Sequence, residues 1–503
     1  MSAPLPGVVP LLGPVVLVGP PGAGKSTAGA RAAALLGLPF LDLDDEIGRV
    51  AGQSVDALFA AEGETSFRVR EAQALALALD GRNLLIAAGG GVVDAAPNRA
   101  RLQRAHVIWL DVDDDTALLR LAGARPWLPA DDDARRSVYR LREAGRRPLR
   151  AELAHARVDG RGPVEGVARE LAELIAQRPL PVEEWRGDTL ADGRVVDWSA
   201  RPLAEVVAGG FGVVDAGVPQ DVPGLRLPGG EGEKTLAGLE RTLRALLVAP
   251  HGSAIVAVGG GAFLDRVGAA AALLRRGTPW IAVPTTPLAM ADAGLGGKTA
   301  LNLDDTKNPV GAFHPPEQTR LWLPFLQSCS DAMRVDGLAE ALKHAWLTGQ
   351  PLVGPWEGAE DLARWVRQSV AVKAGVVMRD PRERGLRSAL NLGHTVGHAL
   401  ERVAGLSHGE AVRRGLLAAL WLSERALGLE PAVATWMRQM HAALGPLPPL
   451  AVDEARALTA LRQDKKGGRF VLLAALGRPV LATPPAELVS AALGVALAGS
   501  GAP

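Results

Sequence analysis

The chain has 503 residues, 55 basic and 55 acidic side chains, 48% hydrophobic residues and a formal net charge of zero. At roughly 100–200 residues per domain this length predicts two or three domains, and the composition excludes wholesale disorder. Nucleic acids and anionic membranes select positively charged proteins, so we expect neither as a partner. The single cysteine, Cys329, excludes a disulfide framework and a cysteine-based zinc cluster. The sequence shows no apolar run long enough for a membrane span, and we expect a cytoplasmic protein.

The first part of the chain alternates between strand-like and helical patterns. Val15–Val18, Leu84–Ala87 and Val107–Leu110 are apolar runs typical of buried parallel strands. The alternation predicts an α/β domain with a three-layer parallel sheet over residues 10–176. The sequence QRPLP then indicates a linker over residues 177–182.

A second α/β pattern occupies residues 183–325, and helical patterns dominate residues 326–495. We therefore expect a second α/β domain followed by a mostly helical one. The strand candidates of this half are Phe211–Asp215, Ala254–Val258, Trp280–Pro284 and, last in the chain, Phe470–Ala474.

Gly19–Ser26 reads G-P-P-G-A-G-K-S and fits the phosphate-binding pattern G-x-x-x-x-G-K-[ST]. It follows a predicted strand and begins a predicted helix, a context that argues against a chance glycine-rich turn. Backbone N–H groups would hold phosphates, Lys25 would reach the terminal ones and Ser26 would bind Mg²⁺. The expected ATP-binding residues are Gly22, Ala23, Gly24, Lys25, Ser26 and Thr27.

Further motifs follow in order along the first half. They are D-x-D at Asp42–Asp44, G-E-x-x-F-R ending at Arg68, G-G-G at Gly89–Gly91, R-P at Arg125 and R-x-P-L starting at Arg146. Asp45 suits the N-cap of the helix expected next. With the phosphate-binding loop, this ordered set resembles shikimate kinases over residues 10–176.

The resemblance implies that the first half phosphorylates shikimate with MgATP. It implies Mg²⁺ binding by Ser26 and Asp42, and catalysis by Lys25, Asp44 as the base and Arg125, which also binds ATP. It implies shikimate binding by Asp44, Arg68, Gly90, Gly91 and Arg146. Two guanidinium groups suit one substrate carboxylate. Shikimate kinases usually have Tyr after R-x-P-L, where this chain has Arg150, and we expect that change to affect packing rather than chemistry.

The helical part carries a histidine motif. In N-L-G-H-T-V-G-H the spacing of four residues puts His394 and His398 on one helix face, and His408 follows. Glu340 lies upstream in G-L-A-E-A-L-K. A carboxylate with imidazoles is a usual ligand set for catalytic Zn²⁺, whereas a lone histidine is as often a hydrogen-bonded helix residue.

These residues resemble 3-dehydroquinate synthase from residue 183 onward. Further matches are Glu231–Lys234, Val258–Gly261 with Asp265, Val283–Thr286, Gly296–Thr299 and Asp464–Lys466. The resemblance implies a Rossmann-like α/β domain with a mostly helical metal-binding domain, and a homodimer formed through this half. It implies NAD⁺- and metal-dependent conversion of 3-deoxy-D-arabino-heptulosonate 7-phosphate to 3-dehydroquinate plus phosphate.

The same resemblance assigns the residues. Zn²⁺ or Co²⁺ would be bound by Glu340, His394 and His408. NAD⁺ would be surrounded by Asp215, Glu231, Lys234, Gly260, Gly261, Asp265, Thr285, Thr286, Lys298 and Lys307. Substrate would be bound by Arg276, Asp292, Lys298, Asn308, Lys343, Lys373, Arg387, Asn391, His398 and Lys465 or Lys466. Lys298, Lys343 and His398 would be catalytic.

Departures from that family lie around the nucleotide. Leu264 replaces a usual glycine, Gly217 a common asparagine, and Ala293-Gly294 a common Ser-Ser. A side chain near a close backbone approach can block a ligand, so Leu264 predicts a weaker NAD⁺ site.

Two alternatives stay open for the second half. In one alternative, the second half is a related sugar-phosphate cyclase or a polyol dehydrogenase. The substrates of those enzymes lack the carboxylate that Lys373 and Arg387 would bind, which argues against this alternative. In the other alternative, the second half is a degenerate scaffold without activity. The complete sets of expected metal-binding and anion-binding residues argue against it.

Only eight of the 55 basic residues are lysine, and all eight lie in matched motifs. A persisting lysine indicates that a compact ammonium group is needed there.

Overall fold

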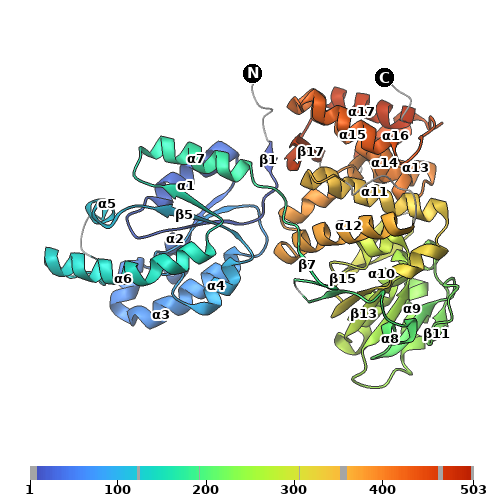
Figure 1. The fold of residues 1–503 in the computed structure, drawn as a ribbon, viewed down its shortest axis with the longest axis horizontal. Coiled ribbons are helices and arrows are strands. Elements are labelled where there is room, and N and C mark those ends of the chain that lie inside the picture. Colours follow the sequence, from blue (N-terminus) through green and yellow to red (C-terminus); the bar gives the residue numbers. More distant parts are fainter. Residues whose placement is uncertain are drawn as a thin grey trace. The chain divides into compact units, whose positions relative to one another are not determined.

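The computed structural model describes residues 8–121, 125–191, 193–304, 306–351, 359–462 and 468–499. The chain divides into two compact units (Figure 1). The first unit comprises Pro6–Arg178 and the short segment Arg382–Ser388, and the second comprises Pro179–Pro381 and Ala389–Pro503.

The first unit is built on five parallel strands in the order β3-β4-β2-β5-β6. They are β2 (Val15–Val18), β3 (Phe40–Asp42), β4 (Leu85–Ala87), β5 (His106–Asp111) and β6 (Ala156–Asp159), and β1 (Val9–Pro10) precedes them. All residues of β2, β4 and β5 are buried, because helices cover both faces of the central strands. The three strands expected from the sequence are confirmed.

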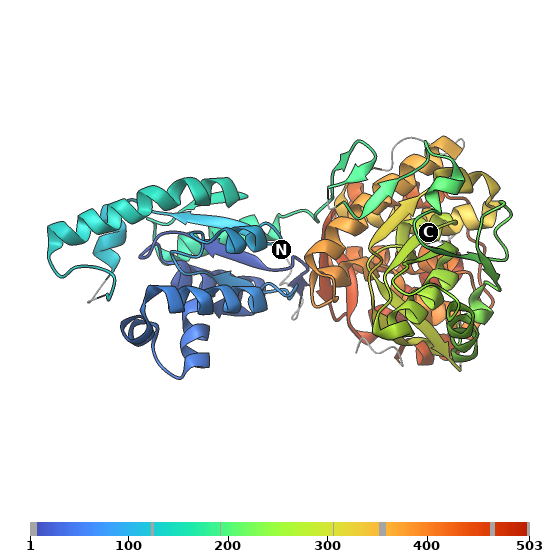
Figure 2. The same ribbon diagram turned by 90° about the horizontal axis from the view of Figure 1, so that it is seen from below.

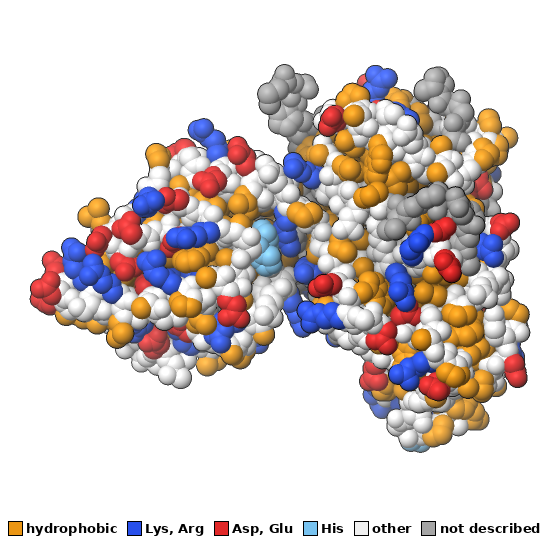
Figure 3. Space-filling model, viewed as in Figure 1, with side chains coloured by type: hydrophobic (Ala, Val, Ile, Leu, Met, Phe, Trp, Pro, Cys, Tyr) orange, Lys and Arg blue, Asp and Glu red, His pale blue; other side chains and the backbone are white. Residues whose placement is uncertain are grey.

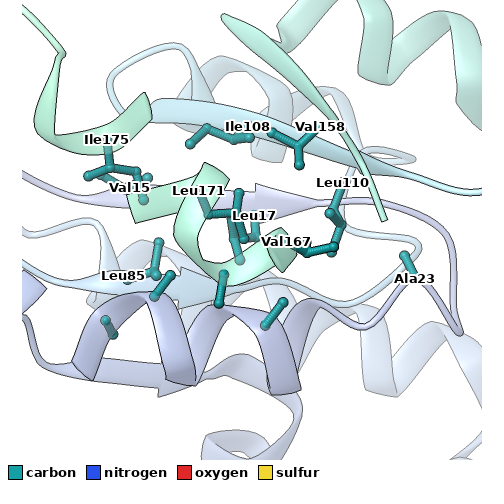
Figure 4. Close-up of a cluster of buried hydrophobic side chains, with 14 of the residues drawn as sticks. Val15, Leu17, Ala23, Leu85, Ile108, Leu110, Val158, Val167, Leu171 and Ile175 are labelled. Atoms are coloured by element: carbon teal, nitrogen blue, oxygen red, sulfur yellow. The ribbon is translucent and has the colours of Figure 1, made fainter. Parts of the chain in front are cut away.

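Helices cover both faces of this sheet. They are α1 (Lys25–Leu36), α2 (Leu43–Ala51), α3 (Val55–Ala78), α4 (Ala96–Leu102), α5 (Asp114–Arg120), α6 (Asp132–Leu153) and α7 (Val164–Ala176). Val15 and Leu17 of β2 pack with Leu171 of α7 on one face (Figure 4). Val16 of β2 packs with Leu43 of α2 on the other. Because neighbouring strand residues point to opposite faces, one strand supplies both cores of a three-layer α/β fold.

The second unit contains an eight-stranded sheet in the order β11-β10-β12-β13-β16-β9-β8-β7. Figure 2 shows green strands of this unit among green and orange helices. The strands are β7 (Trp185–Arg186), β8 (Thr189–Leu190), β9 (Val195–Asp197), β10 (Phe211–Asp215), β11 (Leu225–Leu227), β12 (Ile255–Gly259), β13 (Trp280–Pro284) and β16 (Gln318–Leu321). From β11 to β9 all neighbours are parallel, which gives the expected Rossmann-like sheet. Its helical elements are α8 (Leu203–Val206), η1 (Glu231–Glu233), α9 (Leu236–Leu246), α10 (Gly261–Leu273), η2 (Leu274–Arg276) and η3 (Ala289–Ala293).

The rest of this unit is mostly helical, as expected. Its helices are η4 (Leu323–Ser328), α11 (Asp331–Thr348), α12 (Ala359–Arg379), η5 (Leu386–Asn391), α13 (His394–Ala404), α14 (His408–Leu427), α15 (Pro431–Ala442), α16 (Glu454–Arg462) and α17 (Ala486–Ala498). Two antiparallel hairpins, β14 (Lys298–Leu303) with β15 (Thr306–Phe313) and β17 (Phe470–Ala475) with β18 (Arg478–Ala482), complete it. We did not expect the first hairpin, because β15 is mostly exposed and lacks an apolar run.

The N-cap expected at Asp45 is wrong. Asp42 caps α2 instead, and its side chain accepts hydrogen bonds from the backbone N–H groups of Asp44 and Asp45 at 3.0 and 3.4 Å. The helix therefore begins earlier, and Asp44 lies in its first turn.

Acidic and basic side chains are intermixed on the face shown in Figure 3, as the zero net charge leads one to expect. Among the described residues, no helix is both long and apolar enough to cross a membrane.

Candidate active sites

The first candidate site is built on the turn between β2 and α1. Gly22 and Gly24 have φ angles of 84° and 88°, in the left-handed region that favours glycine. A Cβ atom at Gly22 would lie 2.3 Å from the carbonyl oxygen of Ala117. Gly24 caps α1 without a side-chain hydrogen bond. The N–H groups of the first helical turn are therefore suited to bind an anion.

Lys25 begins α1 and is buried. Its Nζ donates hydrogen bonds to the carbonyl oxygens of Gly19 and Pro20 at 3.0 and 2.9 Å. Burial, with a smaller contribution from Arg150, lowers the pKa of Lys25 to about 8. The ammonium group thus sits within the glycine-rich turn, where a phosphate would meet it.

A cavity of about 690 Å³ opens beside this turn. The residues that the sequence assigned to this site and that line the cavity are Gly22, Ala23, Gly24, Lys25, Ser26, Thr27, Asp42, Asp44, Arg68, Gly90, Gly91, Arg125 and Arg146. The fold therefore brings every residue expected in the kinase site to one cavity.

Asp44 is the candidate base. Its Oδ1 atom is buried and has no hydrogen-bond partner among the described residues. Burial and the neighbouring Asp42 carboxylate raise the pKa of Asp44. A raised pKa makes a carboxylate a better proton acceptor, so Asp44 suits general-base catalysis.

The two expected carboxylate-binding arginines are held by acidic residues. Arg68 pairs with Glu71 of the same helix at 2.9 Å, and Arg146 pairs with Asp94 at 2.6 Å. A Cβ atom at Gly91 would lie 2.4 Å from Nη2 of Arg68, so glycine lets this guanidinium group approach the loop. Glu71 and Asp94 were not expected from the sequence, since no motif marks them.

Arg125 is the expected lid arginine. Its Nη1 lies 3.2 Å from Oδ2 of Asp56, and both side chains are more than a third exposed. Exposed ion pairs are weak, so Arg125 can exchange Asp56 for a phosphate at little cost.

The second candidate site contains a metal-binding cluster. Glu340 of α11 is fully buried, and neither of its carboxylate oxygens has a hydrogen-bond partner among the described residues, although Lys343 forms an ion pair with it. Its Oε1 lies 3.5 Å from Nε2 of His394 and 3.6 Å from Nε2 of His408. Three converging ligand atoms, one on a buried carboxylate, fit a zinc or cobalt ion.

Charges within the cluster favour a cation. Burial opposes ionisation of Glu340, yet Lys343 and the two imidazoles hold its pKa well below the usual range. Burial and Lys343 lower the pKa of His394, which keeps that imidazole neutral. Burial opposes protonation of His408, but Glu340 and Glu401 raise its pKa to about 10. Metal binding would displace that proton.

Two further lysines pair with carboxylates in the second unit. Lys373 bonds with the side chain and with the backbone carbonyl oxygen of Asp292. Burial by itself would raise the pKa of Asp292, but the ammonium group of Lys373 outweighs this effect and lowers the pKa. Lys234 lies 2.6 Å from Asp265, whose pKa burial raises to about 6. The fold thus gathers charged groups expected to bind substrate and nucleotide.

The expected nucleotide residues lie at the carboxyl ends of neighbouring strands. Asp215 ends β10 and Gly259 ends β12. The strand order reverses between these two neighbours, because the chain continues from β10 to β11 on one side and then to β12 on the other side of β10. Such a reversal creates the crevice in which α/β sheets bind nucleotides. Thr285 donates its backbone N–H to the Gly259 carbonyl oxygen at 3.0 Å, and a Cβ atom at Gly260 would lie 3.6 Å from Thr286.

The side chain of Leu264 lies in the hydrophobic core. Leu264 is fully buried and packs in the hydrophobic core of the α/β part, together with Leu239 and Val267. The weaker NAD⁺ site expected from Leu264 stays a prediction.

The β14–β15 hairpin links other expected residues. Asn302 donates its side-chain amide to Glu231 at 2.8 Å and accepts the backbone N–H of Asn308 at 3.1 Å. Lys307 pairs with Glu401 at 2.6 Å, and Glu401 lies 3.7 Å from Nδ1 of His408. Asn302 and Glu401 were not expected from the sequence, because their contacts join distant segments of the chain.

The remaining expected residues are placed as follows. Lys298 begins β14 and is exposed, and the ring of His398 lies 5.2 Å from that of His394. Gly261 begins α10, and Asn391 ends η5. Arg276 is exposed in η2, and Arg387 is buried in the segment that groups with the first unit. Lys465 and Lys466 lie outside the described residues.

Comparisons with known proteins agree with this division. The family model for shikimate kinase matches residues 21–176, and those for the N- and C-terminal parts of 3-dehydroquinate synthase match residues 224–334 and 337–467. The chain is 31% identical to a bifunctional shikimate kinase/3-dehydroquinate synthase of Thermotoga maritima, over 90% of this chain and 93% of the relative. It is 41% identical to a 3-dehydroquinate synthase of Aeropyrum pernix, over 54% of this chain and 80% of the relative.

Among solved structures, the second unit resembles a 2-deoxy-scyllo-inosose synthase complexed with carbaglucose-6-phosphate, NAD⁺ and Co²⁺. The TM-score is 0.52 at 26% identity, over 56% of this chain and 89% of that chain. The cavity of the first unit, the metal-binding cluster of the second and the family matches support the same assignment. The chain belongs to the family of bifunctional shikimate kinase/3-dehydroquinate synthases.

Proposed function

We propose that residues 10–176 phosphorylate shikimate with MgATP. We propose further that residues 183–495 convert 3-deoxy-D-arabino-heptulosonate 7-phosphate to 3-dehydroquinate and phosphate. The observation that carries the first activity is a cavity that all the expected kinase residues line together. The second is carried by the buried Glu340 carboxylate, which faces His394 and His408.

In the kinase unit, the main role of the side chains would be to hold the charged groups of ATP, Mg²⁺ and substrate in position. Lys25 and the N-terminus of α1 would hold the phosphates, while Ser26 and Asp42 would hold Mg²⁺. Asp44 would accept the proton of the attacking hydroxyl, as its raised pKa favours. Arg68 and Arg146 would hold the substrate carboxylate, and closure of Arg125 over the phosphates would exclude water.

In the synthase, Glu340, His394 and His408 would hold Zn²⁺ or Co²⁺, and the Gly260–Gly261 turn would border NAD⁺. When bound, these cofactors supply a Lewis acid and a reversible hydride acceptor, so the reaction has no net redox change. Asp292, Lys343 and Asn391 would orient substrate hydroxyl groups. Lys373 and Arg387 would hold the carboxylate.

The remaining roles concern the phosphate and the nucleotide. Arg276, Lys298, Asn308 and His398, with Lys465 or Lys466, would hold the phosphate that leaves. Asp215, Glu231, Lys234, Asp265, Thr285, Thr286 and Lys307 would surround NAD⁺.

One assay of the full chain tests both activities. Each substrate is supplied in turn with its cofactors, and shikimate 3-phosphate, 3-dehydroquinate and phosphate are quantified. Phosphate release with net NADH formation would contradict the synthase and favour a polyol dehydrogenase. No turnover in the presence of Zn²⁺ and NAD⁺ would favour a scaffold. A cytoplasmic location and a homodimer through the synthase half stay predictions, the latter open to sedimentation analysis.

A further inference from the structure

The kinase unit contains a buried ion pair that the proposed phosphoryl transfer does not use. Arg150 of α6 is 1% exposed, and its Nη1 donates to Oε2 of Glu143 at 2.5 Å. Its Nη2 donates to the backbone carbonyl oxygen of Gly90 at 2.8 Å. The tyrosine usual in shikimate kinases has one hydroxyl group and could not make both contacts.

Glu143 connects this pair with the expected shikimate ligand Arg146. The three residues share one face of α6, since spacings of three, four and seven residues return to the same side of a helix. Oε1 of Glu143 accepts from Arg150 at 3.3 Å and from Arg146 at 3.5 Å. The side chain of Glu143 is 2% exposed, so water has little access to replace either contact.

We propose that Arg150 is a positioning residue of the shikimate pocket, which fixes Gly90 and, through Glu143, the guanidinium group of Arg146. Gly90 follows β4 and Arg146 lies on α6, and both line the cavity. Arg150, itself on α6, bonds to the loop at Gly90 and to Glu143 of its own helix, so it ties the loop to the helix that carries the carboxylate-binding group. The inference rests on the proposed kinase function.

A role in packing alone would not need this chemistry. The Nε of Arg150 is buried without a hydrogen-bond partner among the described residues, which opposes folding. An apolar or aromatic side chain would fill the space without that cost. The guanidinium group instead donates in a plane to two acceptors, and this geometry suits a bridge between loop and helix.

Steady-state kinetics of Arg150→Met test the proposal. We expect the KM for shikimate to rise at least about tenfold, with the KM for ATP and kcat changed less than about twofold. The matched control is Arg140→Met on the same helix, where Arg140 is 55% exposed and pairs with Asp115. That control should leave all three constants unchanged.

A folded Arg150→Met protein with an unchanged KM for shikimate would overturn the proposal. If the variant does not fold, the double variant Arg150→Met/Glu143→Met also removes the buried carboxylate that has lost its closer partner, and its KM for shikimate decides in the same way. A wild-type chain unable to phosphorylate shikimate would overturn the proposed function together with this inference. If the wild type is active and the Arg150→Met variant has an unchanged KM for shikimate, the inference alone is overturned.

Discussion

The ammonium group of Lys25 donates a hydrogen bond to the carbonyl oxygen of Pro20 at 2.9 Å, within the glycine-rich turn that begins α1. The side chain is held inside the turn and is only 9% exposed. The position of the charge is therefore set by the loop itself, and the protonation of this one group should control the affinity for ATP.

The pH dependence of the kinase should show the titration of Lys25. Its pKa of about 8, lowered mainly by burial, means that the free enzyme loses this positive charge as the pH rises. We expect kcat/KM for MgATP to fall above pH 8, approaching tenfold per pH unit, since this constant reports the free enzyme. Rates measured from pH 6.5 to 9.5 at saturating shikimate check this. A Lys25→Arg variant stays protonated and should lack the descending limb, and a flat wild-type profile would contradict the assignment.

The two activities should fail independently. Lys25→Ala removes the phosphate-binding ammonium group and should lower kinase turnover by at least about 100-fold, with synthase turnover unchanged. His394→Ala removes a metal ligand from the other unit and should abolish only the synthase. Both rates are measured on each purified variant. If either substitution silences both reactions, the two sites are not independent.

Metal removal should inactivate the synthase selectively. Glu340, His394 and His408 converge on a space suited to a transition metal, whereas the kinase needs only Mg²⁺ with ATP. After dialysis against a chelator, excess Mg²⁺ should restore the kinase, and only Zn²⁺ or Co²⁺ should restore the synthase. Metal content by atomic absorption should fall in His394→Ala and persist in His251→Ala, which alters an exposed histidine. Equal metal content in both variants would exclude His394 as a ligand.

Restoring the glycine usual in the family at position 264 should destabilise this chain. Leu264 is fully buried in the core, so Leu264→Gly leaves a cavity and a flexible residue in α10. We expect a loss of about 3–5 kcal/mol in unfolding free energy and no tighter NAD⁺ binding. The control Leu273→Gly alters a leucine of the same helix that is 60% exposed, and it should cost about 1 kcal/mol. Denaturant unfolding and NAD⁺ titration measure both effects, and a stable variant with higher affinity would show that Leu264 does obstruct the site.

The sequence was sufficient for elements whose pattern is local. Val15–Val18 is a continuous apolar run, and it forms a central strand that is buried on both faces. The turn before Lys25 needs glycines at fixed positions, so motif and geometry coincide. The β14–β15 hairpin escaped prediction, because the exposed strand β15 carries no hydrophobic periodicity.

The rarity of lysine was also informative. Lys25, Lys234, Lys343 and Lys373 are all buried at the two candidate sites, three of them paired with carboxylates. A compact ammonium group fits such enclosed positions better than a guanidinium group. Composition alone therefore pointed to residues that the fold places in the sites.

The sequence by itself determined the family, the alternation of strands and helices, and most of the candidate ligands, because these depend on residue type and short-range spacing. Only the tertiary structure decided which way Leu264 points, that Asp42 caps α2, and that Arg150 reaches Gly90 sixty residues away. Each of these depends on how a helix is set against its sheet or a distant loop. That placement results from packing between remote segments, which local periodicity does not encode.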